Sequence, residues 1–276
     1  MTAKAKIRNT LLVAVGMGFG LFSFTGCNSN QSYETTSSGL LYRIINNEAQ
    51  GDSAAPGKFM KVNVRTVIND SVVKETEDQW VPVRRSTGRQ YDMMEGLALL
   101  SKGDSAEFKI PATHIYVQVL DVQDQQGYQA ALAKASEHQK EIDAGIIKKY
   151  VDSVGAQAKM TDDGVAVIVH QAGEGETAQD GQSVSIMYTG KTLDGTVFDS
   201  NQDSSFNHTD PLAFQLGQGR MIPGMESGMK LLKKGAEATL VIPSTLAYGE
   251  RGRPPHIQPN AVLLFDVKVL DVKDKE

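Results

Sequence analysis

Cysteine is nearly absent from this chain, and histidine is scarce. A single Cys in 276 residues excludes an intramolecular disulfide framework. With only five His, the chain also lacks the clustered Cys and His ligands of a structural zinc site. The five show no metal-ligand spacing, so each is expected at the surface or in packing: His114, His138, His170, His208 and His256.

An excess of positive charge is also missing. The 28 Lys and Arg residues stand against 33 Asp and Glu, which gives a formal net charge of -5. Such a chain has no electrostatic footprint for a phosphate backbone, so no nucleic-acid partner is expected. The composition of 40% hydrophobic and 22% charged residues, with 26 Gly and 9 Pro, is typical of a globular protein. It is not typical of a disordered, collagen-like or polytopic membrane protein.

A long apolar run lies at the N-terminus. Leu11–Phe24 follows a basic stretch, is short for a bilayer span, and predicts a signal peptide over residues 1–26. The small residues directly before the Cys resemble the lipobox of bacterial lipoproteins, which implies acylation of Cys27. A buried structural Cys is the alternative. We therefore expect a membrane attachment through a lipid anchor on Cys27, in the bacterial cell envelope, at the outer membrane and facing the periplasm or the surface.

Two parts of the remaining chain resemble each other. Corresponding pieces are Gly39–Ile45 and Gly164–Val169, Asp70–Val73 and Asp194–Val197, Leu99–Gly103 and Leu231–Gly235, Phe108–Pro111 and Leu240–Pro243, and Val117–Val122 and Val267–Val272. This internal duplication predicts two related β-rich domains, at residues 39–125 and 159–276. A polar tether over residues 27–38 precedes them.

The segment between the two copies lacks Pro and is rich in Ala, Lys, Glu and Gln. Its apolar residues fall on a narrow face: Leu132, Ile142, Ile146, Ile147, Tyr150 and Val151. This pattern predicts a helical linker over residues 126–158. In the simpler interpretation the helix packs onto one of its own domains. The alternative is a homodimer whose seam is the 128–154 helix.

Within the copies the periodicity is that of β-strands. Val184–Tyr188 and Val262–Val269 alternate or run apolar with β-branched residues, and Asp194–Gly195 is a strong signal for a tight turn. Met225–Lys234 has helical spacing, with Gly235 as a stop signal. The fold class is therefore expected to be α+β, with a short helix lying across an antiparallel sheet in each copy.

Five motifs of the second copy occur in an order that resembles the FKBP-type peptidyl-prolyl cis-trans isomerases. They are Val-Ser-Ile-Met-Tyr-Thr-Gly (184–190), Gly-Thr-Val-Phe-Asp-Ser (195–200), Met-Ile-Pro-Gly-Met (221–225), Ile-Pro-Ser-Thr-Leu-Ala-Tyr-Gly (242–249) and Leu-Leu-Phe-Asp-Val (263–267). The resemblance covers the second copy fully and the first in part. It implies two FKBP-like domains, each a curved antiparallel sheet around a short helix with an apolar pocket between them. It also implies an enzyme without a metal or cofactor.

The resemblance further implies a set of pocket residues. Those with a catalytic role are Tyr188, Phe198, Asp199, Ile222, Tyr248 and Phe265, and those that bind substrate are Leu212, Phe214, Met221, Met225 and Ile257. In this family the backbone N–H of Ile222 and the phenol of Tyr248 would hold the substrate carbonyl, while Asp199 accepts from Tyr188. The simpler alternative is that the aromatic residues form the core of a small β domain and that Asp199 caps a turn.

The expected substrates are Xaa-Pro bonds of envelope or exported proteins. Rotation about such a bond faces a barrier of about 18–20 kcal/mol, because amide resonance is lost in the twisted state. The twisted amide has less charge separation than the planar one, so an apolar, water-poor pocket favours it. The alternative function is a non-catalytic peptide-binding module or chaperone, which would have little need for the set Tyr188, Asp199, Ile222 and Tyr248.

The second copy departs from the family pattern at a few positions. Met225 stands where the family often has Trp, and Leu212 stands where it often has an aromatic residue. The long polar loop Asn201–Asp210 lacks the Arg that often partners the Asp at position 199. Because Met is flexible, the pocket is expected to persist but to hold prolyl rings less rigidly.

The first copy departs much further. Val64 replaces Tyr188, Lys74–Glu75 replaces Phe198–Asp199, and the equivalent of Leu246–Leu263 is missing after Ala112. Isomerase activity is therefore not expected in the first copy. Trp80 and Tyr91 near this degraded site are assigned to packing, with peptide binding as the alternative.

Overall fold

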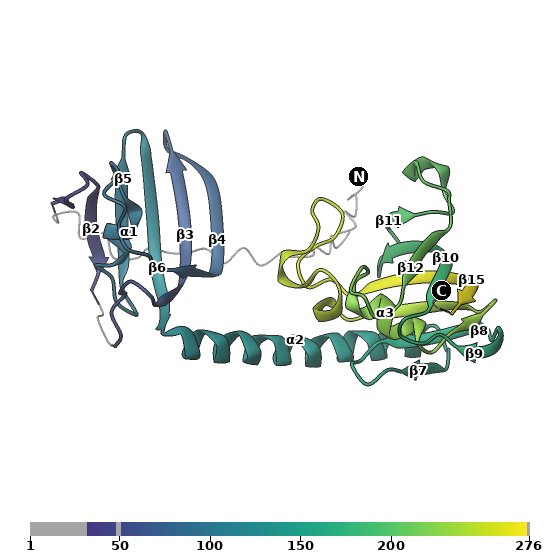
Figure 1. Cartoon of the computed structure of the whole chain (residues 1–276). Coiled ribbons are helices and arrows are strands. Elements are labelled where there is room, and N and C mark those ends of the chain that lie inside the picture. The colour runs from purple at the N-terminus through teal and green to yellow at the C-terminus, as the bar shows by residue number, and fades with distance from the viewer. Residues whose placement is uncertain (1–31, 48–50, 275–276) are drawn as a thin grey trace, which may run out of the picture. The chain divides into compact units, whose positions relative to one another are not determined.

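A computed structural model describes residues 32–47 and 51–274 of the chain. The predicted signal peptide, the proposed lipidation site Cys27 and the tether up to residue 31 lie outside the described residues. The division between two compact units falls between Tyr128 and Gln129. The fold is α+β, with one antiparallel sheet before the long helix α2 (Gln125–Ser153) and another after it, as Figure 1 shows.

The first unit contains a six-stranded sheet and a short helix. The strand order is β1-β2-β5-β6-β3-β4. The bounds are β1 Glu34–Thr35, β2 Leu41–Asn46, β3 Phe59–Ile68, β4 Ser71–Pro82, α1 Met93–Leu97, β5 Ser105–Ile110 and β6 Thr113–Gln123. Its core gathers around Leu40, Met60, Leu100 and Phe108, all fully buried. A single apolar cluster therefore holds α1 against this sheet.

The second unit contains a larger sheet. The strand order is β11-β10-β15-β14-β8-β7, with β12 paired to β10, and β13 pairs separately with β9. The strand bounds are β7 Ala158–Met160, β8 Ala166–Gln171, β9 Glu174–Thr177, β10 Ser183–Thr192, β11 Val197–Ser200, β12 Leu212–Gln215, β13 Lys233–Lys234, β14 Glu237–Ile242 and β15 Leu263–Lys273. The helical segments are α3 Pro223–Met229 and the single 3-10 turns η1 Ser204–Phe206, η2 Ser244–Leu246 and η3 Gly249–Arg251.

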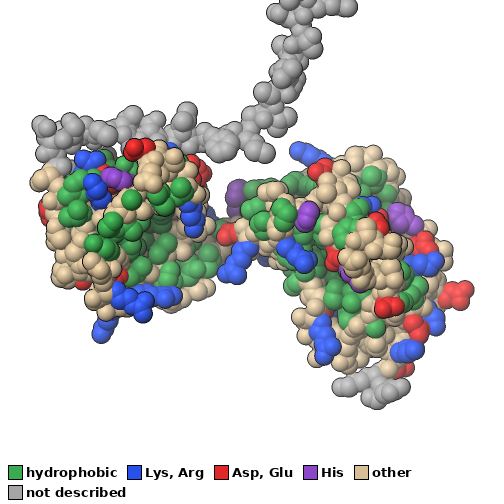
Figure 2. All heavy atoms as spheres, turned by 90° about the horizontal axis from the view of Figure 1, so that it is seen from above, with side chains coloured by type: hydrophobic (Ala, Val, Ile, Leu, Met, Phe, Trp, Pro, Cys, Tyr) green, Lys and Arg blue, Asp and Glu red, His purple; other side chains and the backbone are tan. Residues whose placement is uncertain are grey.

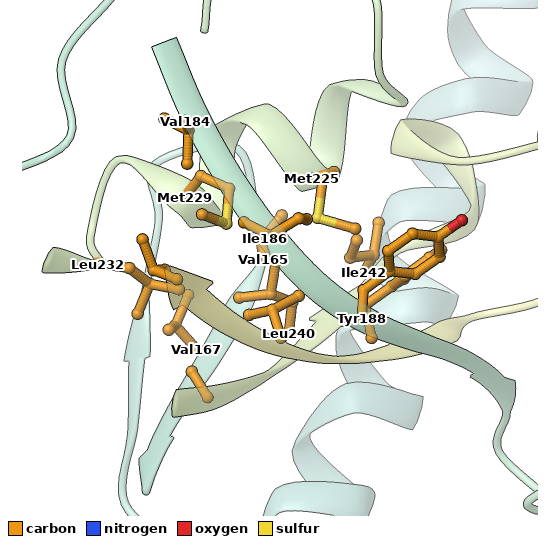
Figure 3. Packing of buried hydrophobic residues seen from close by; sticks show 14 of the residues in the cluster. Val165, Val167, Val184, Ile186, Tyr188, Met225, Met229, Leu232, Leu240 and Ile242 are labelled. Atoms are coloured by element: carbon orange, nitrogen blue, oxygen red, sulfur yellow. The ribbon is translucent and has the colours of Figure 1, made fainter. Parts of the chain in front are cut away.

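Helix α3 provides the methionines at the centre of this unit. Met225 and Met229 are fully buried, and Figure 3 shows both side chains among the aliphatic residues of the sheet. Pro223 occupies the first turn of the helix, where its missing N–H costs no hydrogen bond. The helix is shorter than the pattern predicted, since it ends at Met229 and Lys233–Lys234 instead pairs with β9. The prediction of a helix through Lys234 was therefore wrong at its C-terminal end.

The two sheets have matching strand orders. Written from the opposite edge, the second is β7-β8-β14-β15-β10-β11, so each strand of the first sheet has a counterpart. The registers also agree: Val64 lies opposite Val117 in β6, as Tyr188 lies opposite Val267 in β15. Both pairings contain a bulge at the equivalent point, before Val62 and before Ile186.

Each helix meets its sheet through a glycine at the equivalent position. A Cβ on Gly96 would lie 2.3 Å from the ring of Phe108, and one on Gly228 would lie 2.9 Å from Leu240. Only a residue without a side chain allows this approach of helix to sheet. The similarity between Leu99–Gly103 and Leu231–Gly235 therefore continues into the preceding helices, where Gly96 and Gly228 make equivalent contacts with the sheets.

Helix α2 crosses the division between the units: its first residues, up to Tyr128, belong to the first unit, and the rest belongs to the second. At its start, Tyr128 stacks on Phe59 at 4.1 Å between ring centroids and meets Trp80 edge-on at 5.2 Å. Near its end, Ile147 is 2% exposed and forms a separate apolar cluster with the outer face of the second sheet. The other members of that cluster are Ile146, Tyr150, Val151, Ala156, Ala158, Ala166, Ile168, Val241, Val262 and Leu264. Burying such an isoleucine stabilises by about 1.5–3 kcal/mol, so this half of α2 is part of the second unit's core.

Within the described ranges, 32–47 and 51–274, the helices are all too short or too polar to cross a membrane.

Candidate functional site

The residues predicted for the pocket come together in the second unit. Ten of the eleven are apolar or aromatic, and all ten belong to the cluster around α3 and the inner face of the sheet. Those that are buried are Tyr188, Phe214, Met225, Ile257 and Phe265, and those that are partly buried are Phe198, Leu212, Met221, Ile222 and Tyr248. They derive from strands β10, β11, β12 and β15, from the start of α3 and from the segment between β14 and β15.

Three aromatic rings lie close together beside a glycine on β10. Phe198 and Phe265 meet at 5.6 Å between centroids with their planes 78° apart, and Tyr188 lies 6.3 Å from Phe265. A Cβ on Gly190 would lie 2.7 Å from Phe198 and 3.0 Å from Phe265, so the absence of a side chain there allows the two rings to meet. Edge-to-face contacts of this kind fix the orientation of the rings as well as burying them.

A hydrogen-bonded network of polar side chains borders these rings. The phenol of Tyr188 donates to Oδ2 of Asp199 at 3.0 Å, and Nε2 of His208 lies 3.0 Å from Oδ1 of the same carboxylate. Burial raises the pKa of Tyr188 above its usual value, and the bond to Asp199 raises it further. The phenol is therefore a protonated donor near neutral pH. Figure 3 shows its oxygen at the border of the aliphatic cluster, pointing away from it.

Asn201 fixes the loop that follows Asp199, and sequence reasoning did not identify it. Its side chain is 1% exposed, accepts from the backbone N–H of Tyr188 at 2.6 Å, and donates to the carbonyls of Ile186 and Asp210 at 3.1 Å. A buried amide that is bonded on both sides holds the loop ends against β10. Asn in a polar loop carries no distinctive signal, so the sequence offered little to find it by.

The start of α3 is ordered by a second residue that the sequence did not single out. Glu226 is 9% exposed, and its carboxylate accepts from the backbone N–H groups of Gly217 at 3.1 Å and Met221 at 3.4 Å. Ile222 follows as the N-cap of α3 in an extended conformation. Among the backbone hydrogen bonds of the described residues, the N–H of Ile222 is not a donor, so it is available to a ligand.

The segment between β14 and β15 contributes the remaining two residues. Tyr248 is the N-cap of η3, and its phenol is close enough to Tyr188 to affect the pKa of that residue. Ile257 is 1% exposed and pairs with Arg253 through two backbone hydrogen bonds, 2.8 and 3.0 Å long. A further bond from the N–H of Asn260 to the carbonyl of Gly249, 2.8 Å long, closes the segment.

The first unit has no counterpart to this segment. Strands β5 and β6 are joined through Pro111 and Ala112 alone, where β14 and β15 are separated by residues 243–262. The alignment of Lys74–Glu75 with Phe198–Asp199 was wrong by one residue. Lys74 pairs with Thr66 as Asp199 pairs with Gly190, and Val73 occupies the bulge position of Phe198. Val73 is 54% exposed, so the aromatic floor is missing there.

Two aromatic residues of the first unit, Trp80 and Tyr91, pack against other side chains of that unit. Trp80 packs on Tyr128, and Tyr91 packs against the core of the first unit. Both contacts support the interpretation that these side chains serve packing.

Charged side chains of both signs lie on the surface of the two units (Figure 2). In the view of Figure 2, Lys and Arg side chains are scattered among acidic and polar ones on both units. Among residues 32–47 and 51–274, no group of three or more His, Cys, Asp or Glu side chains gathers as metal ligands would.

Comparison with known sequences and structures identifies relatives of the second unit. The sequence profile of the FKBP-type peptidyl-prolyl cis-trans isomerase family matches residues 174–270. The chain is 40% identical over 126 residues to the FKBP-type peptidyl-prolyl cis-trans isomerase FkpA of Escherichia coli, covering 46% of this chain and 43% of that protein. The crystal structure of FkpA from Escherichia coli aligns with 36% identity and a TM-score of 0.41, covering 55% of this chain and 70% of that one.

A shorter relative is covered over most of its length. The chain is 48% identical over 97 residues to the peptidyl-prolyl cis-trans isomerase FPR2 of Saccharomyces cerevisiae, which is 35% of this chain and 69% of that protein. Of several longer curated relatives it spans between 25% and 48% of the length. Through its second unit, the chain belongs to the FKBP-type peptidyl-prolyl cis-trans isomerases.

Proposed function

We propose that the second unit of this chain catalyses the cis-trans isomerisation of Xaa-Pro bonds in envelope or exported polypeptides. The observation that carries the proposal is the gathering of ten predicted apolar and aromatic residues in one cluster. That cluster is bordered by the bond from Tyr188 to Asp199. A purely structural core would not need a buried phenol and a carboxylate at its rim, since polar groups cost free energy on burial.

The mechanism is desolvation of the amide without covalent chemistry. The rings of Phe198 and Phe265 give the prolyl ring apolar surface, and the buried side chains of Met225 and Ile257 complete the apolar cluster behind them. The planar amide carries more separated charge than the twisted one, so exclusion of water raises the ground state relative to the transition state.

Orientation is the second contribution. The N–H of Ile222 and the phenol of Tyr248 donate to the substrate carbonyl, and neither requires the amide to stay planar. Asp199 fixes the direction of the Tyr188 phenol and takes no proton from the substrate. The predicted roles of Leu212, Phe214 and Met221 are to complete the apolar wall.

The test is NMR exchange spectroscopy on a peptide with one Xaa-Pro bond, with the full chain added in catalytic amounts. We expect faster cis-trans exchange with the wild type and little acceleration with Phe198→Ala. A wild-type chain that binds the peptide without accelerating exchange would favour a non-catalytic peptide-binding module or chaperone instead.

The first unit is proposed to be a degenerate copy of the isomerase domain that does not catalyse. The matching strand orders and the shared bulge support the common origin. The absence of a segment like 243–262 between Ile110 and Thr113 supports the loss of activity, because that segment supplies Tyr248 and Ile257.

A bacterial lipid anchor on Cys27 is proposed from the sequence that precedes it. Acylation requires the thiol, and the chain contains no other Cys. Cys27→Ser is therefore expected to abolish fatty-acid labelling and to release the protein from the membrane fraction. The isomerase rate should not change. A wild-type protein that carries no lipid would contradict the anchor and indicate a secreted isomerase instead.

A homodimer through α2 would have to use the part of the helix that does not pack on the second sheet. Ile146, Ile147, Tyr150 and Val151 already pack there, whereas Ile142 is 43% exposed. Light scattering of the wild type and of Ile142→Lys tests this arrangement, which predicts a dimer for the first and a monomer for the second.

A further inference from the structure

A buried carboxylate on α2 binds the segment that leads to Tyr248. Asp143 is fully buried, and its Oδ2 accepts from both the backbone N–H and the hydroxyl of Ser244, each at 2.7 Å. Its Oδ1 accepts from Nε2 of Gln139, one turn earlier on the helix, at 2.8 Å. A carboxylate that leaves water retains its charge cheaply only when it is bonded in this way.

Ser244 begins the turn that leads to Tyr248. Residues Ser244–Leu246 form η2, and its N-cap, Pro243, makes no side-chain hydrogen bond to the turn. Asp143 therefore does for η2 what a capping residue does for a helix, although it comes from a different element about a hundred positions earlier. Ser244 is itself fully buried, so water does not satisfy its N–H in place of Asp143.

The turn η2 connects Ser244 to Tyr248 in the candidate site. The N–H of Leu246 donates to Pro243 and that of Ala247 donates to Ser244, both at 3.0 Å, and Tyr248 follows directly. A Cβ on Gly224 would lie 3.3 Å from Cβ of Leu246, so the turn also packs tightly against α3. The position of Tyr248 thus depends on where Ser244 is held.

We propose that Asp143 is a positioning residue for the isomerase reaction, which acts by holding the Ser244–Tyr248 segment from the helix behind the sheet. The proposal rests on the proposed function of the second unit. Its physical basis is that loss of the carboxylate leaves a buried N–H and a buried hydroxyl without acceptors, and the segment moves to find new ones. Even a displacement of about 1 Å at a group that orients the substrate lowers the rate when the fold itself survives.

The test compares three variants of the full chain. Asp143→Ala removes both acceptor atoms and should lower kcat/KM for a Xaa-Pro peptide by about tenfold, mainly through kcat. Asp143→Asn should restore most of that rate, since its oxygen can accept from Ser244 while its NH2 group donates to a rotated Gln139. Ile147→Ala is the matched control, because Ile147 is buried one turn later on α2 and its apolar side chain cannot accept a hydrogen bond from Ser244.

A second readout does not depend on activity. The Ser244 amide and the Tyr248 ring are followed by NMR, and we expect their signals to shift in Asp143→Ala and to stay in place in Ile147→Ala. If Asp143→Ala does not fold, Ser244→Ala replaces it, which removes the hydroxyl donor alone and should cost about threefold in rate.

The outcomes separate the two proposals. An inactive wild type would contradict the proposed function, and the NMR signals would still decide the role of Asp143. An active wild type with equal rate losses in Asp143→Ala and Ile147→Ala, or with no loss in the former, would overturn the positioning role. Unchanged Ser244 and Tyr248 signals would overturn it as well.

Discussion

His208 lies beside Asp199, with Nε2 of the imidazole 3.0 Å from Oδ1 of the carboxylate. The loop Asn201–Asp210 lacks the Arg that often partners an Asp at this position in the family. The loop instead brings a histidine to it, and the two rings of His208 and Tyr188 stack at 6.4 Å between centroids. His208 was assigned to the surface or to packing, and the structure adds a contact with the candidate site.

The two partners of the carboxylate should differ in importance. Tyr188 is 7% exposed, so Asp199→Ala leaves a buried phenol without its acceptor and should cost about 1–3 kcal/mol of stability. The side chain of His208 is 46% exposed, so His208→Ala should cost less than about 1 kcal/mol. Chemical denaturation of the two variants checks the order, and a larger cost for His208→Ala would contradict it.

The pocket variants separate desolvation from orientation. Tyr248→Phe removes one hydrogen bond and should lower kcat/KM between about twofold and about tenfold. Phe198→Ala opens the apolar wall beside Phe265 and should lower it by more than about tenfold. The peptide exchange assay measures both rates. Equal losses would mean that exclusion of water is not the dominant contribution.

Truncation tests whether α2 is part of the isomerase domain. A chain of residues 129–276 keeps Asp143 and the cluster around Ile147, and we expect it to isomerise at nearly the full rate. A chain of residues 159–276 loses both and should be destabilised by several times the ~1.5–3 kcal/mol of one buried side chain. A chain of residues 39–125 should be inactive. Full stability of residues 159–276 would show that the helix is only a spacer.

Acid should destabilise the first unit through two carboxylates at α1. The hydroxyl of Ser37 and the N–H of Ser38 lower the pKa of Glu95 to about 2, and the N–H groups of Thr87 and Met94 lower that of Asp92 to about 2. Both values lie below those of the unfolded chain, so the stabilisation is present above about pH 4.5 and is lost as the pH falls towards 2.

The measurement is thermal unfolding of the first unit between pH 6 and pH 2.5. Glu95→Gln should lower the melting temperature at pH 6 and make it less dependent on pH below that. A variant with the same pH dependence as the wild type would show that Glu95 does not contribute.

The glycines in α1 and α3 that contact the sheets should not tolerate alanine. Gly96→Ala and Gly228→Ala each force a methyl group into a core side chain, and each should destabilise its own unit by about 1–3 kcal/mol. The control is Gly145→Ala in the middle of α2, where no atom other than the nearby backbone of the helix itself lies within 4 Å of the added Cβ. That variant should instead stabilise the helix by about 1 kcal/mol. Stabilisation in all three, measured by thermal unfolding, would contradict the packing argument.

The sequence by itself indicated most of the elements and named the residues proposed for the candidate site. Strand alternation predicted β10 and β15, Asp194–Gly195 predicted the turn between β10 and β11, and the Pro-free polar segment predicted α2. These features depend on local pattern, which hydrogen bonding and backbone sterics convert directly into structure. The five motifs named the family, and their apolar residues meet in one cluster.

Tertiary structure alone decided which polar groups support the site. Asp143 and Ser244 are about a hundred positions apart, and Glu226 and Asn201 bond to backbone groups that no side-chain pattern reveals. The one-residue shift of the alignment at Lys74 is visible only in the pairing of β3 with β4. A bulge there adds one residue, and a comparison of the sequences alone does not locate it. The hydrophobic pattern specifies which faces are buried, but buried polar atoms take whichever partner the folded chain brings within reach.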